Sequence, residues 1–247
     1  MDRPHKHENQ PKPLTKQEIH DATVARVSAI DKEFNDGFNF MKHYPRSVSI
    51  FGGVRIAESD PYYAMARSLG SRIVNELNYS VFTGGGPGIM EAANRGAFEA
   101  GGQSLGLTIE LPFEQQSNQY LTKFLDFYYF FSRKVCLHFS GEAYVFFPGG
   151  FGTFDEFFEI LTLVQTGKIE KVPIILFGSE YWNKVDNLIK EILLSRNAID
   201  PTDVHLYKIT DNEDEVIEII RNAPVRNGLK FEHDAIYGHH RVEDAKE

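Results

Sequence analysis

Short runs rich in β-branched and aromatic residues alternate with helical stretches throughout the chain from Ser47 onward. Strands that alternate with helices in this way form βαβ units and a mostly parallel sheet. We predict strands at 47–51, 80–83, 104–109, 126–131, 143–147, 172–177 and 205–209. We predict helices between them at 60–77, 87–101, 132–140, 153–167, 179–197 and 212–222. The alternation therefore defines an α/β fold class.

The region before Ser47 has a different pattern. Thr15 and Glu18 have the spacing of a capping box, and apolar residues from Ile19 to Met41 recur at helical spacing, so we expect one long amphipathic helix. Prolines and mixed charges precede it, and polar residues end the chain. We divide the chain into a flexible leader (1–13), an N-terminal helix (14–44), a main α/β domain (45–222) and a polar tail (223–247).

A first glycine-rich turn follows the predicted strand 80–83 and contains Gly84, Gly85, Gly86 and Gly88. Ligands of open α/β sheets bind at the carboxyl ends of strands, and the N-terminus of the following helix offers free N–H groups to an anion. The turn is a candidate phosphate cradle. It lacks the Gly-Lys-Ser/Thr ending of a P-loop and the last glycine of a dinucleotide fingerprint. A packing turn and a ligand site both remain open.

A second glycine-rich turn follows the predicted strand 143–147. Its candidate phosphate contacts are Gly149, Gly150, Gly152 and Thr153. Thr153 is expected to cap the helix that follows, with Asp155 and Glu156 in the first helical turn. The helix macrodipole stabilises carboxylates there, so these two need no catalytic role. An acid beside a phosphate cradle is nevertheless electrostatically unfavourable, which favours a chemical use for it.

A basic pair, Arg133 and Lys134, stands near the start of the predicted helix 132–140. Cations oppose the macrodipole at a helix N-terminus, so the pair suits an anionic ligand or a carboxylate better than it suits helix stability. A solvated basic pair is the plain alternative. One helix and one strand separate Arg133 from Glu156, which brings both to the same edge of the sheet.

Composition narrows the classes of partner. Of 247 residues, 26 are Lys or Arg and 35 are Asp or Glu, so the formal charge of −9 argues against a nucleic acid polymer as partner. One cysteine, a polar first segment and no apolar run of about 20 residues predict a cytoplasmic protein without a membrane span. The histidines show no ligand spacing, so we expect no metal.

Several separated motifs resemble the LOG family of cytokinin riboside 5′-monophosphate phosphoribohydrolases, long labelled "possible lysine decarboxylase". The hallmark P-G-G-x-G-T-x-x-E is present at 148–156, with Arg133 and Lys134 upstream. The similarity spans about Val48 to Trp182 and includes GGGPGIMEAANRGA at 84–97, IELPFEQ at 109–115 and LTLVQTGK at 161–168. Short family members usually have Glu before the Arg-Lys pair, where this chain has Ser132.

The resemblance implies a Rossmann-like, doubly wound sheet with helices on both faces, and a homodimer. It implies hydrolysis of the N-glycosidic bond of a nucleoside 5′-monophosphate, AMP-like or a cytokinin riboside monophosphate, to free base and ribose 5-phosphate. By the same resemblance, Arg133 and Glu156 would be the catalytic pair, and the two glycine-rich turns would contact phosphate and ribose. No cofactor is implied, and no lysine has a recognisable pyridoxal phosphate context.

Two other functions remain as rivals. A non-catalytic nucleotide or molybdenum-cofactor carrier, which the chain resembles more distantly, needs the glycine-rich turns but not the pair Arg133 and Glu156. An NAD-dependent oxidoreductase needs a complete dinucleotide fingerprint, which is absent. The sequence therefore favours the hydrolase and leaves the identity of the base open.

Overall fold

A computed structural model describes residues 13–110 and 117–224 of the chain. The predictions for the leader and for nearly all of the C-terminal tail lie outside the described residues, as does most of the IELPFEQ segment. Within the described residues, no helix combines the length and apolar character needed to cross a membrane.

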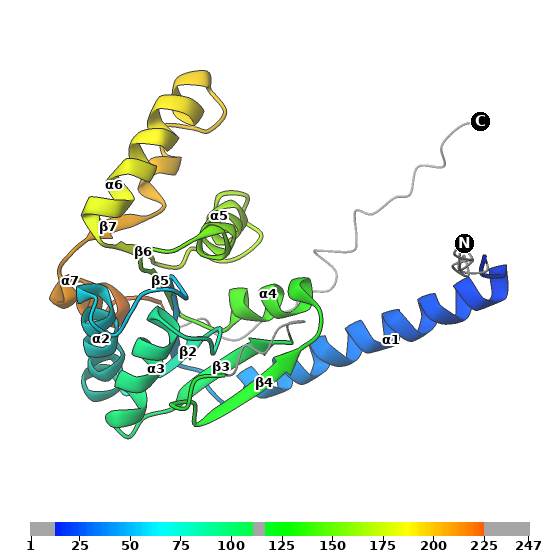
Figure 1. The fold of residues 1–247 in the computed structure, drawn as a ribbon. Helices are drawn as coiled ribbons and strands as arrows, with labels where there is room; N and C mark the ends of the chain where they lie inside the picture. The colour runs from blue at the N-terminus through cyan, green and yellow to red at the C-terminus, as the bar shows by residue number, and fades with distance from the viewer. Residues whose placement is uncertain (1–12, 111–116, 225–247) are drawn as a thin grey trace, which may run out of the picture.

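Seven described strands form one parallel sheet in the order β4-β3-β2-β1-β5-β6-β7 (Figure 1). Their bounds are β1 Ser47–Phe51, β2 Ser80–Thr83, β3 Ser104–Ile109, β4 Lys123–Phe127, β5 Ala143–Phe146, β6 Ile174–Phe177 and β7 Lys208–Thr210. The chain winds outward from β1 in one direction and then from β5 in the other. The doubly wound, Rossmann-like fold is therefore confirmed, and its switch point lies between β1 and β5.

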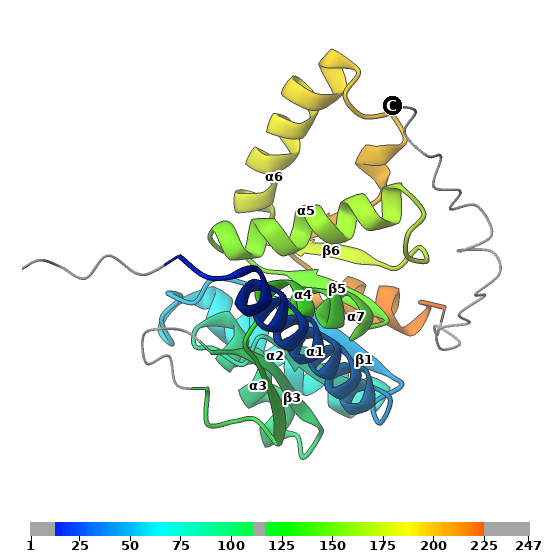
Figure 2. The same cartoon turned by 90° about the vertical axis from the view of Figure 1, so that its right-hand side faces the viewer.

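Helices cover both faces of the sheet (Figures 1 and 2). One face packs against α2 (Pro61–Leu77), α3 (Ile89–Glu99) and α7 (Glu213–Arg221). The other packs against α1 (Lys16–Met41), α4 (Phe130–Phe139), α5 (Phe151–Gln165) and α6 (Ser179–Leu188). Side chains of β5 alternate between the two cores: Val145 faces the first, and Tyr144 and Phe146 face the second.

The predicted strand 126–131 is misplaced. β4 is Lys123–Phe127, and Phe130 already begins α4. β4 pairs only with β3 at the edge of the sheet, and most of its residues are exposed. An exposed edge strand does not need an apolar pattern, so the sequence of β4 gave no strand signal. The aromatic run that follows β4 does look like a buried strand, and the prediction was drawn to it. The predicted strand 205–209 is also wrong in its bounds, because β7 begins three residues later at Lys208.

The predicted helix 179–197 is not one regular α-helix. The regular α-helix α6 ends at Leu188. A π-helical turn, Ile189–Leu193, and a 3₁₀ turn, Leu194–Arg196, follow it directly. The π-helical and 3₁₀ turns use backbone hydrogen bonds of different spacing, which residue periodicity does not reveal.

α1 begins as predicted, with the reciprocal capping box of Thr15 and Glu18. Its two halves differ in environment. All residues from 16 to 29 are exposed, whereas Gly37 and Met41 are buried against the body of the protein. The N-terminal half of α1 therefore projects away from the sheet (Figure 1).

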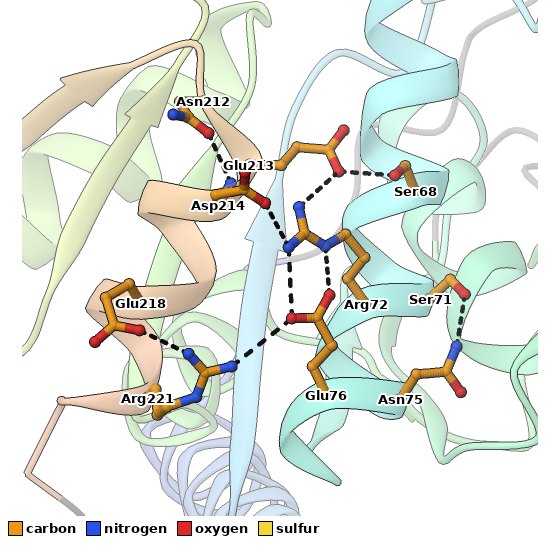
Figure 3. Close-up of polar contacts among 10 residues, drawn as sticks. All are labelled: Ser68, Ser71, Arg72, Asn75, Glu76, Asn212, Glu213, Asp214, Glu218 and Arg221. Atoms are coloured by element: carbon orange, nitrogen blue, oxygen red, sulfur yellow. Dashed lines mark hydrogen bonds and ion pairs between the residues drawn. The ribbon is translucent and has the colours of Figure 1, made fainter.

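An ion-pair network joins α7 to α2 on the face of the sheet opposite to α1 (Figure 3). Arg72 Nε lies 2.6 Å from Glu76 Oε1, and Arg72 Nη2 lies 2.7 Å from Asp214 Oδ1. Arg221 extends the network from α7 back to Glu76 at 3.7 Å. The charged groups are largely at the surface, so we attribute the packing of α7 mainly to buried Val216, Ile217 and Ile220.

Candidate active site

The loop after β1 links the two glycine-rich turns at the carboxyl edge of the sheet. The Gly53 N–H donates to the carbonyl of Pro148 at 2.9 Å, and the Gly53 carbonyl accepts from the Ile89 N–H at 3.1 Å. Pro148 precedes the second turn, and Ile89 begins the helix after the first. The loop after β1 therefore holds both turns beside the switch point between β1 and β5, the place where doubly wound sheets bind ligands.

The first turn is enclosed by a buried polar network. The Gly85 N–H donates to Thr83 Oγ1 at 2.9 Å, and the Asn118 amide donates to the carbonyl of Gly86 at 3.1 Å. Gly85 and Gly88 both have positive φ. A Cβ at Gly88 would overlap the carbonyl oxygen of Gly53. The geometry gives these glycines a packing role.

The second turn is open. A Cβ at Gly150 or Gly152 would meet nothing within 4 Å. The prediction that Thr153 caps α5 is wrong, because the N-cap is Gly150 and Thr153 is the third helical residue, buried against Gly149. Asp155 consequently lies beyond the first helical turn. The helix therefore begins two residues earlier than the side-chain pattern predicts.

Glu156, beyond the first turn of α5 as well, is 7% exposed, although the macrodipole argument applies mainly to that first turn. Its Oε2 is buried and has no hydrogen-bond partner among the described residues. Placing a carboxylate in such a position costs free energy unless a cation or a ligand compensates it. Burial of Glu156 is therefore poorly explained by helix stability alone.

Arg133 extends from α4 across the carboxyl edge. Its Nε donates to the carbonyl of Leu107 in β3 at 2.7 Å, and its Nη2 lies against Gly84 in the first turn. Burial lowers the pKa of Arg133, and the nearby negative charge of Glu156 opposes that shift. An arginine stays protonated in either case. The structure thus brings Arg133, the first turn and Glu156 together.

Lys134 lies on the α5 side of α4. Its Nζ is 2.8 Å from Asp155 Oδ2 and also contacts Glu159. Burial lowers the pKa of Lys134, but the hydrogen bonds to Asp155 and Glu159 outweigh burial and raise it overall. The ammonium is therefore charged and already paired with two carboxylates.

His138 is a site residue that the sequence did not indicate. It follows Lys134 by one helical turn and is 2% exposed. Its Nε2 lies 3.4 Å from Glu156 Oε2 and 3.7 Å from Glu159 Oε2. The i, i+4 spacing from Lys134 could have suggested a shared helix face. Nothing in the sequence showed that this face meets α5.

The same three side chains could hold a metal ion in geometric terms. One ligand atom each from His138, Glu156 and Glu159 lies within 4.8 Å of the other two. Histidine nitrogen and carboxylate oxygen suit several divalent ions. The ammonium of Lys134 already supplies a cation to Glu159, so the chemistry of the cluster does not require a metal.

Comparison with known proteins places the chain in a family. The family model described as "Possible lysine decarboxylase" matches residues 90–220, more than half of the chain. The chain therefore belongs to this family, as its motifs indicated.

Curated relatives carry a more specific name. A cytokinin riboside 5′-monophosphate phosphoribohydrolase from Rhodococcoides fascians is 28% identical over 148 residues, covering 59% of this chain and 75% of the relative. A probable enzyme of the same name from Oryza sativa subsp. japonica is 25% identical over 195 residues, covering 78% of this chain and 84% of the relative. These relatives support membership of a hydrolase family.

Solved structures support the fold. The structural genomics target TM1055 has a TM-score of 0.54 at 25% identity and covers 71% of this chain and 98% of its own. The molybdenum cofactor carrier protein of Chlamydomonas reinhardtii has a TM-score of 0.53 at 20% identity, with 71% and 96% covered. The second likeness shows a shared fold alone.

Proposed function

We propose that the protein hydrolyses the N-glycosidic bond of a nucleoside 5′-monophosphate, releasing a free base and ribose 5-phosphate. The observation that carries the proposal is the buried carboxylate of Glu156, held near Arg133 beside an open helix N-terminus at the switch point. The names of the curated relatives support the same reaction class.

The phosphate is proposed to bind at the second turn. The N–H groups of Phe151, Gly152 and Thr153 begin α5, and no hydrogen bond from them to a described residue is present. Such groups and the macrodipole attract an anion. Space around Gly150 and Gly152 admits it. The first turn would then contact the ribose, and Lys134, whose ammonium already contacts Asp155 and Glu159, would have one N–H donor left for the phosphate.

Glu156 is proposed to act at the anomeric carbon. Cleavage of the glycosidic bond develops positive charge on the sugar, which a neighbouring carboxylate stabilises while it also positions or deprotonates the attacking water. Arg133 orients this carboxylate or holds the ribose or phosphate through its terminal nitrogens, because its Nε is already bound to Leu107. The contact of His138 with Glu156 Oε2 fixes the inner oxygen.

The direct test is incubation with a panel of nucleoside 5′-monophosphates, followed by chromatography for free base and an assay for ribose 5-phosphate. Stoichiometric release of both products from at least one nucleotide is expected. Tight nucleotide binding without turnover across the panel would overturn the hydrolase and favour the carrier function. Identical turnover after exhaustive chelation is expected, since the proposed steps involve no metal.

A homodimer is proposed from the exposed half of α1. Ile19, Val24 and Val27 are each more than half exposed, and an isolated amphipathic helix is only marginally stable in water. A second copy covering this stripe would bury it. Sedimentation velocity at micromolar concentration should show a dimer, and replacement of the three residues by Glu should shift it toward monomer. A wild-type monomer would contradict the proposal.

A further inference from the structure

The start of α4 lacks a cap of its own. Tyr129 is the N-cap residue, and its side chain makes no capping hydrogen bond. The first N–H groups of any helix need partners from outside the helix. α4 carries Arg133, Lys134 and His138, so whatever holds its first turn also holds these three side chains.

Glu33 of α1 instead binds the residues at the entry to α4. The Tyr128 N–H donates to Glu33 Oε1 at 2.7 Å, and the Tyr129 N–H donates to Glu33 Oε2 at 3.4 Å. The hydroxyl of Ser132 donates to the same Oε2. One carboxylate therefore gathers three donors at the N-terminus of α4, where negative charge is favourable.

α1 is packed closely enough to fix that carboxylate. A Cβ at Gly37 would overlap Cys136 Sγ, so only glycine allows this approach of α1 to α4. Phe34 and Phe38 contact Phe131 and Phe139 of α4, with ring centroids 6.4 and 5.6 Å apart. Figure 2 shows α1 lying over α4. Burial raises the pKa of Cys136 to about 12, and the charge of Glu33 adds to the shift.

We propose that Glu33 is a positioning residue of the active site, and that α1 is thereby part of the catalytic machinery. Glu33 holds the first turn of α4 and, through it, the guanidinium of Arg133 over the first glycine-rich turn. Only the activity readout of this proposal rests on the proposed function. The position of α4 can be measured independently of any reaction.

Ser132 supplies the means of testing this. It is the third residue of α4, and a glutamate at the third position of a helix reaches back to the N–H of the N-cap residue. That N–H belongs to Tyr129, one of the groups that Glu33 now accepts from. A glutamate at position 132 should therefore provide from within α4 what Glu33 provides from α1.

The experiment compares Glu33→Gln, Glu33→Asp, the double variant Glu33→Gln with Ser132→Glu, and Asp36→Asn. Asp36→Asn is the matched control, because it removes the same charge from α1 and costs only a surface pair with Lys32. Readouts are kcat and KM with the best nucleotide, and amide hydrogen exchange over residues 128–134. Exchange reports on α4 even if no nucleotide is hydrolysed.

Glu33→Gln should accelerate exchange at the start of α4 and lower kcat about tenfold, with KM changed less than threefold because the second turn is untouched. Glu33→Asp should have an exchange rate and a kcat between those of wild type and Glu33→Gln. Asp36→Asn should match wild type in both. Adding Ser132→Glu should restore slow exchange and kcat to within threefold of wild type. Unchanged exchange in Glu33→Gln, or a defect that Ser132→Glu does not reverse, would overturn the proposal.

Discussion

The two glycine-rich turns have similar composition but different surroundings. In the first, the N–H groups of Gly85 and Ile89 are bound within the protein, and added Cβ atoms at Gly85 and Gly88 would overlap neighbours. In the second, Gly150 and Gly152 have open space, and Phe151 between them is 96% exposed. Gly85 and Gly88 of the first turn permit close packing, whereas Gly150 and Gly152 of the second turn leave open space. Gly149, at the start of the second turn, is itself packed against Thr153.

The position of each turn in the sheet explains the difference. β2 lies between β1 and β3, so the first turn is flanked on both sides and covered by Asn118 from beyond β3. β5 lies at the switch point, where the loops of neighbouring strands leave in opposite directions. A glycine-rich motif alone therefore does not distinguish a packing turn from a ligand site.

The largest predicted effect tests whether the second turn carries the chemistry. Glu156→Gln preserves size and hydrogen bonding and removes the charge. We expect kcat to fall about 10²–10⁴-fold, the usual cost of losing a positioned acid or base. Nucleotide binding should be largely retained. Steady-state kinetics and calorimetric binding to the best nucleotide measure the two quantities.

Asp155→Asn is the neighbouring control. Asp155 is exposed and contacts Lys134, so its loss should be much milder. If Glu156 were purely structural, its replacement by Gln would leave turnover intact. Turnover of Glu156→Gln within threefold of wild type, in a normally folded protein, would contradict the mechanism.

The next effect concerns the phosphate. Two charge-assisted hydrogen bonds of about 1.5 kcal/mol each predict a kcat/KM roughly 10²-fold higher for AMP than for adenosine. The loss should appear in kcat as well as KM if phosphate binding energy is used at the reacting bond. Parallel kinetics with the two substrates measure the ratio.

Amide NMR locates the anion. On titration with AMP, the signals of residues 150–153 should shift more than those of residues 84–88, because the N–H groups of residues 151–153 donate to no described residue and a Cβ at Gly150 or Gly152 would meet nothing within 4 Å. Larger shifts at residues 84–88 would show that the first turn, and not the second, binds the phosphate. Equal kcat/KM for AMP and adenosine would remove the phosphate site altogether.

Much of the fold follows from local sequence. β1, β2 and β3 have the predicted bounds, because each strand is buried and flanked by turn residues. α1 begins where its capping box predicts. The errors fall where local rules are weak: β4 is an exposed edge strand, and α5 begins at Phe151 without a side-chain cap.

The site was only partly predictable. The motifs pointed to Arg133 and Glu156, whose side chains the parallel topology directs to one edge. Glu33 and His138 were missed, because their roles depend on how α1 and α5 pack against α4. Such helix–helix registers arise from tertiary packing and leave no local spacing signal.

The smallest predicted effect separates the turns by stability. Gly88 has φ +70°, and its added Cβ would overlap the Gly53 carbonyl, so Gly88→Ala should cost about 1–3 kcal/mol in backbone strain alone. Gly152 lies in α5 with open space, so Gly152→Ala should stabilise by about 0.4–1 kcal/mol. At this chain length each kcal/mol shifts Tm by about 2–4 °C. Thermal unfolding should therefore move Tm in opposite directions for the two variants. A shift of the same sign and size in both would show that the two turns do not differ as their surroundings indicate.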